Sequence, residues 1–174
     1  MRNLINTYNF KTVQKEKSID DYTSVVAQHA SSRVSSKYNF IPTTRAIEVL
    51  NDHGWFPARV MESKTRIEEN KGFQKHVIRF SNEKYNKELM VNDTIPQLIL
   101  KNSHSGTCAF ELSVGLYRVV CQNGLCVANS SLHGNIIRVR HSGYQDLLME
   151  DACKNLVKTL PDTLGTVERF KRKN

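Results

Sequence analysis

The stretch of sequence that decides the fold spans residues 97–143 and reads QLILKNSHSGTCAFELSVGLYRVVCQNGLCVANSSLHGNIIRVRHSG. Apolar and polar residues alternate through much of it, which is typical of strands with one buried face. Three blocks join such a run to a polar end: LILKNSHSGT, YRVVCQNG and IIRVRHSG. We expect these strands to form an antiparallel meander, with a tight bend at Gly115. The predicted strands are residues 97–101, 108–114, 117–121, 125–128 and 136–140.

Two further strands are predicted before this stretch, at residues 55–66 and 73–81, on either side of the turn EENKG. We expect their inward side chains to be Val60, Phe73, Val77, Ile78 and Phe80. Basic side chains would stand partly on the other face: Arg59, Lys64, Arg66, Lys75 and Arg79. That face is either a solvated surface or a basic platform for nucleic acid, and a platform would also expose interleaved aromatic residues.

Three helices are predicted from apolar residues at helical spacing. The first spans residues 19–32 and starts after Ser18. The second is capped by Thr43 or Thr44 and stops at Gly54. The third spans residues 144–160 and is closed by Pro161. Its predicted apolar stripe is Leu147, Leu148, Ala152, Leu156 and Leu160.

These elements predict a single α+β domain, in which a mostly antiparallel sheet is flanked by two to three helices. Residues 1–40 would form an N-terminal arm and helix, residues 41–160 the core domain, and residues 161–174 a basic tail. At 174 residues the chain is long enough to bury a substantial core.

The composition argues against a membrane protein and against a secreted one. Apolar runs are only a few residues long, too short to span a bilayer, and the N-terminus lacks the apolar core of a signal peptide. We therefore expect a cytoplasmic protein without a membrane partner. The net charge of +8 favours polyanionic partners, although many basic proteins bind no nucleic acid.

Four cysteines raise the question of a metal site: Cys108, Cys121, Cys126 and Cys153. The spacing of Cys121 and Cys126 is at the edge of what zinc sites use, and His133 and His141 would complete a ligand set. Free cysteines are also common small residues of a core. We favour buried thiols and expect neither a metal nor another cofactor.

The blocks NSHSGTCA, RVVCQNG and IRVRHSG resemble the family called domain of unknown function 932, also labelled phage/plasmid-like protein. They place the family's Asn-Ser-His loop at residues 102–104 and its Arg-Val-Val-Cys-Gln-Asn strand at residues 118–123. Its Arg-His-Ser-Gly segment falls at residues 140–143. The chain departs from the family at Ser105, where aspartate is usual, and at Gly124, which follows the Gln-Asn pair. The resemblance implies a phage or plasmid origin, and hence the cytoplasm of a bacterial host, but no activity.

Arginines form the centre of the predicted binding site. Arg138 and Arg140 are two residues apart in a strand, so they point to the face opposite Ile137 and Val139. Guanidinium groups on a rigid sheet suit bidentate contacts to phosphate. The alternative is that the arginines pair internally with Glu111, Asp146 or Glu150. The predicted nucleic-acid-binding residues are Arg79, Asn102, His104, Arg118, Asn123, Arg138, Arg140 and His141.

The leading hypothesis is a non-catalytic, nucleic-acid-binding accessory protein that acts on phage or plasmid DNA in recombination, replication or protection. A second hypothesis is a phage inhibitor that binds and occludes a host defence or repair protein. A third is a hydrolase that uses the Asn-Ser-His loop, although the sequence has no nucleophile elbow, HExxH pattern or Walker-type loop. A homo-oligomer also stays open, because the amphipathic N-terminal segment is suited to docking on a neighbouring subunit.

Overall fold

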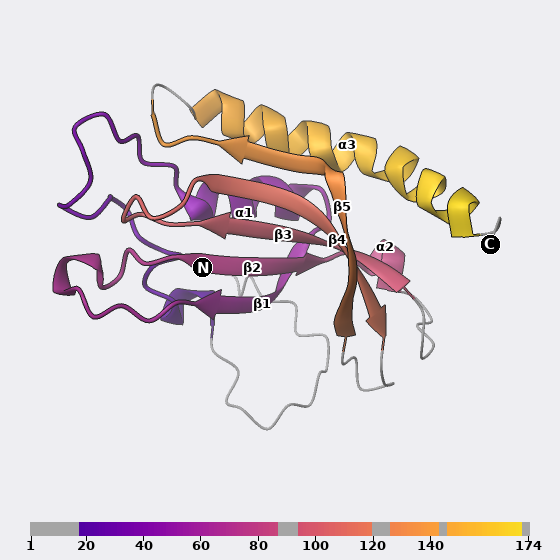
Figure 1. Ribbon diagram of the computed structural model, residues 1–174, viewed down its shortest axis with the longest axis horizontal. Coiled ribbons are helices and arrows are strands. Elements are labelled where there is room, and N and C mark those ends of the chain that lie inside the picture. Colours follow the sequence, from indigo (N-terminus) through magenta and orange to yellow (C-terminus); the bar gives the residue numbers. More distant parts are fainter. Residues whose placement is uncertain (1–17, 87–93, 120–125, 143–145, 172–174) are drawn as a thin grey trace.

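The chain folds around a five-stranded antiparallel sheet whose strands lie side by side in sequence order (Figure 1). The computed structural model describes residues 18–86, 94–119, 126–142 and 146–171, with side chains for residues 18–85, 95–117, 136–142 and 147–161. The strands are β1 (Phe56–Glu62), β2 (His76–Ser81), β3 (Thr94–Asn102), β4 (Phe110–Val119) and β5 (Cys126–Val139). Together with the helices, this meander confirms the predicted α+β class.

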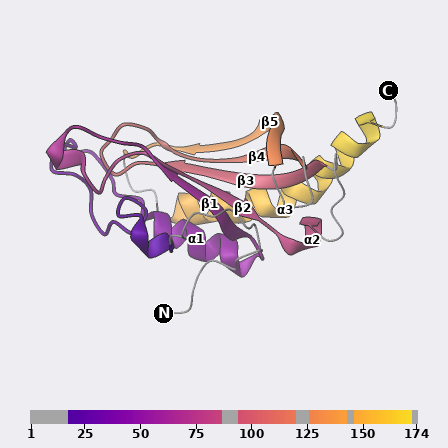
Figure 2. The same ribbon diagram turned by 90° about the horizontal axis from the view of Figure 1, so that it is seen from below.

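One face of the sheet forms the core. A row of paired apolar side chains crosses all five strands: Val60, Ile78, Leu100, Leu112 and Ile137. Two helices cover this row, α1 (Thr43–Asp52) and α3 (Asp146–Lys171), and both lie on the same side of the sheet (Figure 2). They contribute further buried side chains: Ala46, Ile47, Leu50, Met149, Cys153, Leu156 and Leu160. Burial of this apolar layer is the main favourable term for folding.

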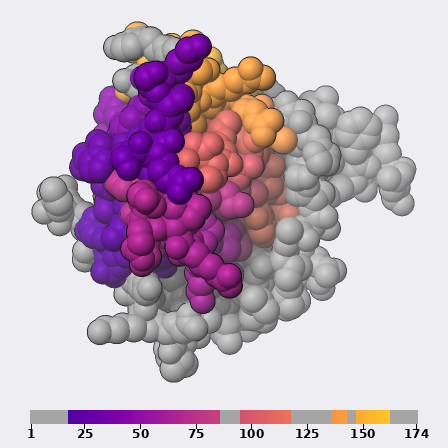
Figure 3. Space-filling model, turned by 60° about the vertical axis from the view of Figure 1, so that its left-hand side comes forward, coloured from indigo at the N-terminus to yellow at the C-terminus, as the bar shows by residue number. Residues whose placement is uncertain are grey.

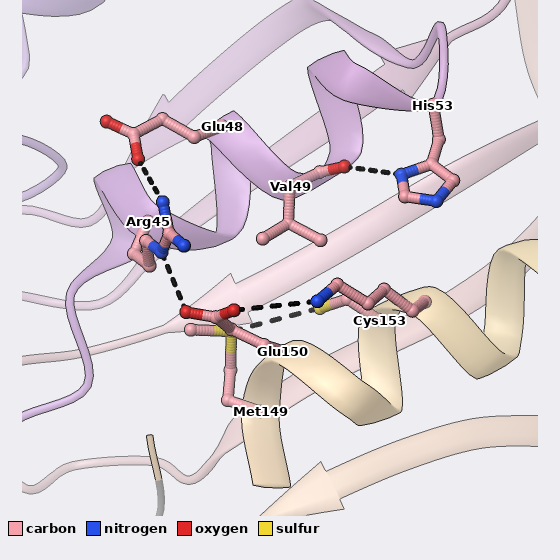
Figure 4. Close-up of polar contacts among 8 residues, drawn as sticks. Arg45, Glu48, Val49, His53, Met149, Glu150 and Cys153 are labelled. Carbon is pink, nitrogen blue, oxygen red and sulfur yellow. Dashed lines mark hydrogen bonds and ion pairs between the residues drawn. The ribbon is translucent and has the colours of Figure 1, made fainter. Parts of the chain in front are cut away.

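Ion pairs orient α1 against α3 (Figure 4). Nε of Arg45 lies 2.7 Å from Oε1 of Glu150, and Nη1 of Arg45 lies 2.9 Å from Glu48. Lys154 lies 3.7 Å from the second oxygen of Glu150. The hydrogen bond from Arg45 lowers the pKa of Glu150. Since Arg45 and Glu48 are largely exposed, these pairs orient the helices more than they stabilise the fold.

The hairpin before the central stretch is confirmed, with shorter strands than predicted. A short 3-10 helix, η2 (Glu68–Asn70), connects β1 and β2, and Gly72 follows it with φ of 80°. Gly54 likewise takes φ of 79° just after α1, as predicted for a helix stop. The placement of Val77 in the core is wrong, because it alternates with the buried Ile78 and points to the opposite face. The short helix α2 (Glu83–Asn86) follows β2.

β4 is one continuous strand, so the prediction of a chain reversal at Gly115 is wrong. The register of the β4–β5 ladder shifts at this glycine, which marks an irregularity within the strand rather than a turn. A Cβ atom at Gly115 would lie 2.8 Å from Cδ1 of Ile99 and 2.9 Å from Cε2 of Tyr117. The glycine is therefore needed for the close approach of two side chains. β5 is also continuous where two strands were predicted.

The helix predicted at residues 19–32 is wrong. Helical geometry is limited there to the 3-10 helix η1 (Ile19–Asp21), which Ser18 caps as predicted. Tyr22 already has extended backbone angles, and the amide of Ser24 donates to a carboxylate oxygen of Glu62 in β1. Backbone groups that bond to the sheet in this way are not available to a helix.

The end predicted for the last helix is also wrong, because α3 runs through Pro161 and reaches Lys171. A proline inside a helix removes one backbone hydrogen bond, and the buried Leu156 and Leu160 anchor the turn before it. The buried stripe is Met149, Cys153, Leu156 and Leu160, whereas Leu147 and Leu148 are exposed. Across the described ranges, no helix combines the length and the apolar content needed to cross a membrane.

Candidate nucleic-acid interface

The Asn-Ser-His loop and the segment after β5 meet at one end of the sheet. Asn102 ends β3, Ser103 and His104 follow it, and His141 lies two residues beyond β5. Residues 18–42, which we call the N-terminal strap, cross this end, where the amide of Ser31 donates to the carbonyl of His104 at 2.8 Å. Figure 3 shows the strap in indigo over the coral and orange strand ends. The side chains from residues 102–104 have no exposed surface.

The hydroxyl of Thr43 is the hub of this buried cluster. Its oxygen lies 2.8 Å from Nε2 of His76, 3.0 Å from Nδ2 of Asn102 and 3.3 Å from Nε2 of His104. Nδ1 of His76 faces the carbonyl of Gln74 at 3.2 Å, so Nδ1 carries the proton and Nε2 accepts from the hydroxyl. The hydroxyl oxygen then accepts from Asn102 and from His104. This assignment leaves Nδ1 of His104 as a buried acceptor without a partner among the described residues.

Asn102 joins the hub to His141 and to the strap. Its Nδ2 donates to the carbonyl of Ile41 at 3.1 Å. Its Oδ1 accepts from the amide of Ser103 at 2.9 Å and lies 3.0 Å from Nε2 of His141. The ring of His141 stacks on Tyr38, with centroids 4.5 Å apart. These bonds fix the strap and the loop to the end of the sheet.

Burial lowers the pKa of each histidine in the cluster. Desolvation lowers the pKa of His76 to about 4, although its bond to the Gln74 carbonyl opposes the shift. The pKa of His104 falls to about 3, first through burial and then through the nearby His76 and His141. Burial also lowers the pKa of His141, and the carbonyl of Asn39 opposes this. At neutral pH His76 and His104 are therefore uncharged parts of the interior.

Ser103 and His104 do not form a nucleophile–base pair. Oγ of Ser103 accepts from the amides of Thr107 and Cys108, each at 3.1 Å, and so closes its own loop. His104 directs Nε2 toward Thr43 instead. Acyl-transfer chemistry needs a nucleophile within reach of its base and open to substrate. This geometry gives the hydrolase hypothesis no support.

Among the residues that the structure describes, no helix lies on the opposite side of the sheet, because α1, α2 and α3 all lie on the other side (Figure 2). Two rows of paired residues point outward. One row is Met61, Val77, Lys101, Glu111 and Arg138, and the next is Arg59, Arg79, Ile99, Ser113 and Ile136. Arg140 is exposed and continues the alternation beyond Arg138. We call these two rows and Arg140 the open face, which carries five basic side chains and one carboxylate.

Glu111 lies between two cations of the open face. It pairs with Nζ of Lys101 and, at 2.6 Å, with Nη2 of Arg138. Burial alone would raise the pKa of Glu111, but Lys101 and Arg138 together hold it below its usual value. The predicted internal pairing is therefore found at Arg138, while Glu150 pairs with Arg45. The side chain of Arg138 stays 65% exposed, so its remaining N–H groups can bind a second anion.

A second fixed group on this side of the sheet is formed by Arg79 and Tyr117. Cζ of Arg79 lies 4.0 Å from the centroid of the Tyr117 ring, within the range of a cation–π contact. Nε of Arg79 donates to Oε1 of Gln97 at 2.7 Å, and Gln97 in turn donates to Ser81. The ring reaches back beside Gly115, where a Cβ atom would collide with it. An aromatic ring across a strand glycine is a known packing device of sheets.

The structure thus separates the predicted binding residues. Arg79, Arg138 and Arg140 lie on the open face, and the predicted opposition of Arg138 to Ile137 and Val139 is confirmed. Asn102 and His104 lie in the buried cluster without exposed surface, where they hold the strap and the loop.

Three predicted residues remain, and two important ones were missed. His141 is half-buried and belongs to the same cluster. Arg118 lies in β4 with its side chain outside the described residues, and Asn123 lies outside them altogether. Lys101 and Tyr117 were not predicted as site residues. Their alternation with Leu98, Leu100 and Leu116 would have placed both on the outward side of the sheet, Lys101 in the open face and Tyr117 beyond it.

No three metal-ligating side chains within the described ranges lie close enough to hold an ion. Cys108 and Cys153 are free thiols, and burial raises the pKa of Cys153 to about 12, which makes this thiol unreactive at neutral pH. The zinc alternative involved Cys121 and Cys126, whose side chains lie outside the described residues.

Comparison with known proteins places the chain in a family. The family model for the domain of unknown function DUF932 matches residues 30–174. Two relatives from Escherichia coli (strain K12), UPF0380 protein YfjQ and UPF0380 protein YafZ, are each 28% identical over 150 residues. Each match covers 86% of this chain and 50% of the relative, so the chain spans about half the length of these proteins. No solved structure matches. The matched residues include both the buried cluster and all five strands of the sheet, and the chain therefore belongs to the DUF932 family.

Proposed function

We propose that this chain is a non-catalytic, nucleic-acid-binding accessory protein of a phage or plasmid, which acts on DNA in recombination, replication or protection. The observation that carries the proposal is the charge of the open face. The open face carries five basic side chains, from β1, β2, β3 and the end of β5. Glu111 is the one acidic residue in the set that defines it. Such a surface attracts a polyanion, and the counterions of the polyanion are released when basic side chains neutralise its phosphates.

The sheet also presents these charges in a fixed arrangement. Adjacent strands lie about 4.8 Å apart, so the face from β1 to β5 is about 19 Å wide. Gln97 holds Arg79, and Glu111 holds both Lys101 and Arg138. Guanidinium groups that are already oriented lose less conformational entropy when they bind phosphate.

A titration of fluorescently labelled DNA, followed by anisotropy at low and at moderate salt, tests the proposal. We expect submicromolar binding at low salt and a steep loss of affinity as salt rises, because each neutralised phosphate releases counterions. Arg59→Gln combined with Arg140→Gln should weaken binding and flatten this salt dependence. The two arginines occupy opposite edges of the open face, and both are exposed. No binding to either single- or double-stranded DNA at low salt would refute the proposal.

An inhibitor that occludes a host protein is the second candidate. The observation that favours it is a pair of large apolar side chains at the start of α3, Leu147 and Leu148, which are 67% and 57% exposed. Exposed neighbouring leucines are typical of protein interfaces. A complex that survives nuclease treatment and is lost on Leu147→Ser with Leu148→Ser would support this candidate over the first.

A further inference from the structure

We infer that the open face takes a single nucleic-acid strand rather than a duplex, with a base stacked at Arg79 and Tyr117 and phosphates bound by the surrounding basic side chains. The inference rests on the proposed function and specifies its ligand. It is carried by the combination of charge, exposed apolar surface and a fixed aromatic group on one side of the sheet.

Apolar side chains are interleaved with the cations. Met61 is 42% exposed and Ile136 is 48% exposed, and each lies in a row with basic side chains. Val77 and Ile99 lie between them, half-buried. The outer surface of a duplex presents phosphates and sugars, which offer little to apolar side chains. A single strand exposes its bases together with its phosphates, and so matches both kinds of group.

Arg79 and Tyr117 supply a surface for stacking. The guanidinium lies 4.0 Å from the ring centroid and is anchored by Gln97 at 2.7 Å. Bases of single strands stack on aromatic rings and on guanidinium planes alike. Gln97 fixes Arg79 by a hydrogen bond, and the ring of Tyr117 packs against Gly115. Both side chains are therefore already ordered, so stacking a base on them costs little additional conformational entropy.

The shape of the open face argues in the same direction. Duplex sequence is read in the major groove, which is about 12 Å wide and admits one helix or a two-stranded ribbon. A face of five strands, about 19 Å across, is too broad to enter it. The two long helices lie on the other side of the sheet, where α1 is paired to α3 through Arg45 and Glu150. The open face is instead a platform along which a flexible strand can lie.

The test compares one labelled DNA strand, the same strand annealed to its complement, and an RNA strand of the same sequence. We expect the wild-type chain to bind the single strands more tightly than the duplex. Tyr117→Leu should weaken single-strand binding by at least about fivefold, in line with the loss of one stacked base. Duplex binding, which depends on charge, should change by less than about twofold. Tyr117→Phe keeps the ring and should lose less single-strand affinity than Tyr117→Leu.

A second variant covers the case in which Tyr117→Leu does not fold. Ile136→Thr keeps a β-branched residue in β5 but removes an exposed apolar contact, so single-strand affinity should fall. Ile67→Thr is the matched control, since Ile67 is 40% exposed but lies in the β1–β2 connection, outside the open face. Weaker single-strand binding by Ile67→Thr and Ile136→Thr alike would contradict the inference.

The outcomes separate the two proposals. Equal affinity for single strand and duplex, with no selective effect of Tyr117→Leu or Ile136→Thr, would overturn the inference and leave the proposed function standing. A lack of binding to all three nucleic acids at low salt would overturn both. Tighter binding of the RNA strand than of the DNA strand would support a single-strand ligand and identify its chemical type.

Discussion

The hydroxyl of Thr43, in the first turn of α1, lies 2.8 Å from Nε2 of His76 in β2. This contact joins a helix to the sheet through polar atoms in a place where both side chains are fully buried. The same hydroxyl also bonds to Asn102 and His104. Because the hydroxyl of Thr43 is engaged in these bonds, it does not cap α1, and the N-terminus of α1 has no side-chain cap.

Replacing this hub should destabilise the fold. Thr43→Val keeps the shape but removes the hydroxyl, so buried polar atoms of His76, Asn102 and His104 lose a partner. We expect the free energy of unfolding to fall by about 2–4 kcal/mol, measured by urea denaturation. Thr43→Ser keeps the hydroxyl and should cost only about 1 kcal/mol, for one buried methyl group. Equal losses for the two variants would contradict this role of the hydroxyl.

The buried histidines should make stability depend on pH. The pKa values of His76 and His104 are about 4 and about 3 in the folded chain, below the ordinary value of about 6.5. Below pH 6.5 the unfolded chain therefore binds more protons, and stability decreases as pH falls. Each histidine contributes up to about 1.4 kcal/mol per pH unit between 6.5 and its folded pKa. Urea denaturation at steps from pH 7.5 to pH 5 measures this slope, and a flat profile would show that the histidines are not held neutral.

Glu111 should limit the charge of the open face. Glu111→Gln frees Lys101 and Arg138 from their shared carboxylate, so nucleic-acid affinity should increase and the salt dependence should steepen. The partly exposed ion pairs contribute at most about 1 kcal/mol each, so the variant should stay folded. Glu150→Gln removes the same charge on the helix side and is the control. The same increase in affinity for both variants would point to net charge rather than to this face.

Gly115 should matter for binding more than for stability. In Gly115→Ala the new Cβ would lie under 3 Å from both Ile99 and Tyr117, so both side chains have to shift. The end of the Ile99 side chain can rotate, which limits the stability cost to about 1–2 kcal/mol. Displacement of the Tyr117 ring should lower single-strand affinity, measured by anisotropy. Retention of full affinity would show that the ring position is unimportant.

The alternation of side chains predicted much of this structure. It identified the regions that form strands, the antiparallel meander and the outward direction of Arg138, although it divided β4 and β5 into two strands each. The same alternation places Asn102 on the inner face with Leu98 and Leu100, but its polar side chain suggested a ligand contact. Polarity alone does not show whether a side chain binds a ligand or completes a buried network.

Other features depend on contacts that sequence patterns do not specify. A glycine in a predicted strand is compatible with a turn or with close packing. At Gly115 the side chains of Ile99 and Tyr117 occupy the space of a Cβ atom, which the sequence pattern does not show. A proline usually ends a helix, but the buried residues that precede Pro161 hold α3 in place. The strap does not form the helix that its apolar spacing predicts, and two of its amides bond instead to distant segments: Ser24 to Glu62 and Ser31 to His104.

The salt dependence of single-strand binding tests the role of the open face most directly. Log affinity falls as log salt rises, and this fall should be less steep in the double variant Arg138→Gln with Arg140→Gln than in the wild-type chain. Each lost phosphate contact removes about 0.7 from the magnitude of the slope, so the two together should remove about 1.4. Lys154→Gln with Lys158→Gln removes the same charge from α3, on the far side of the sheet, and should keep the wild-type slope. An identical change of slope in the two double variants would contradict a binding site on the open face.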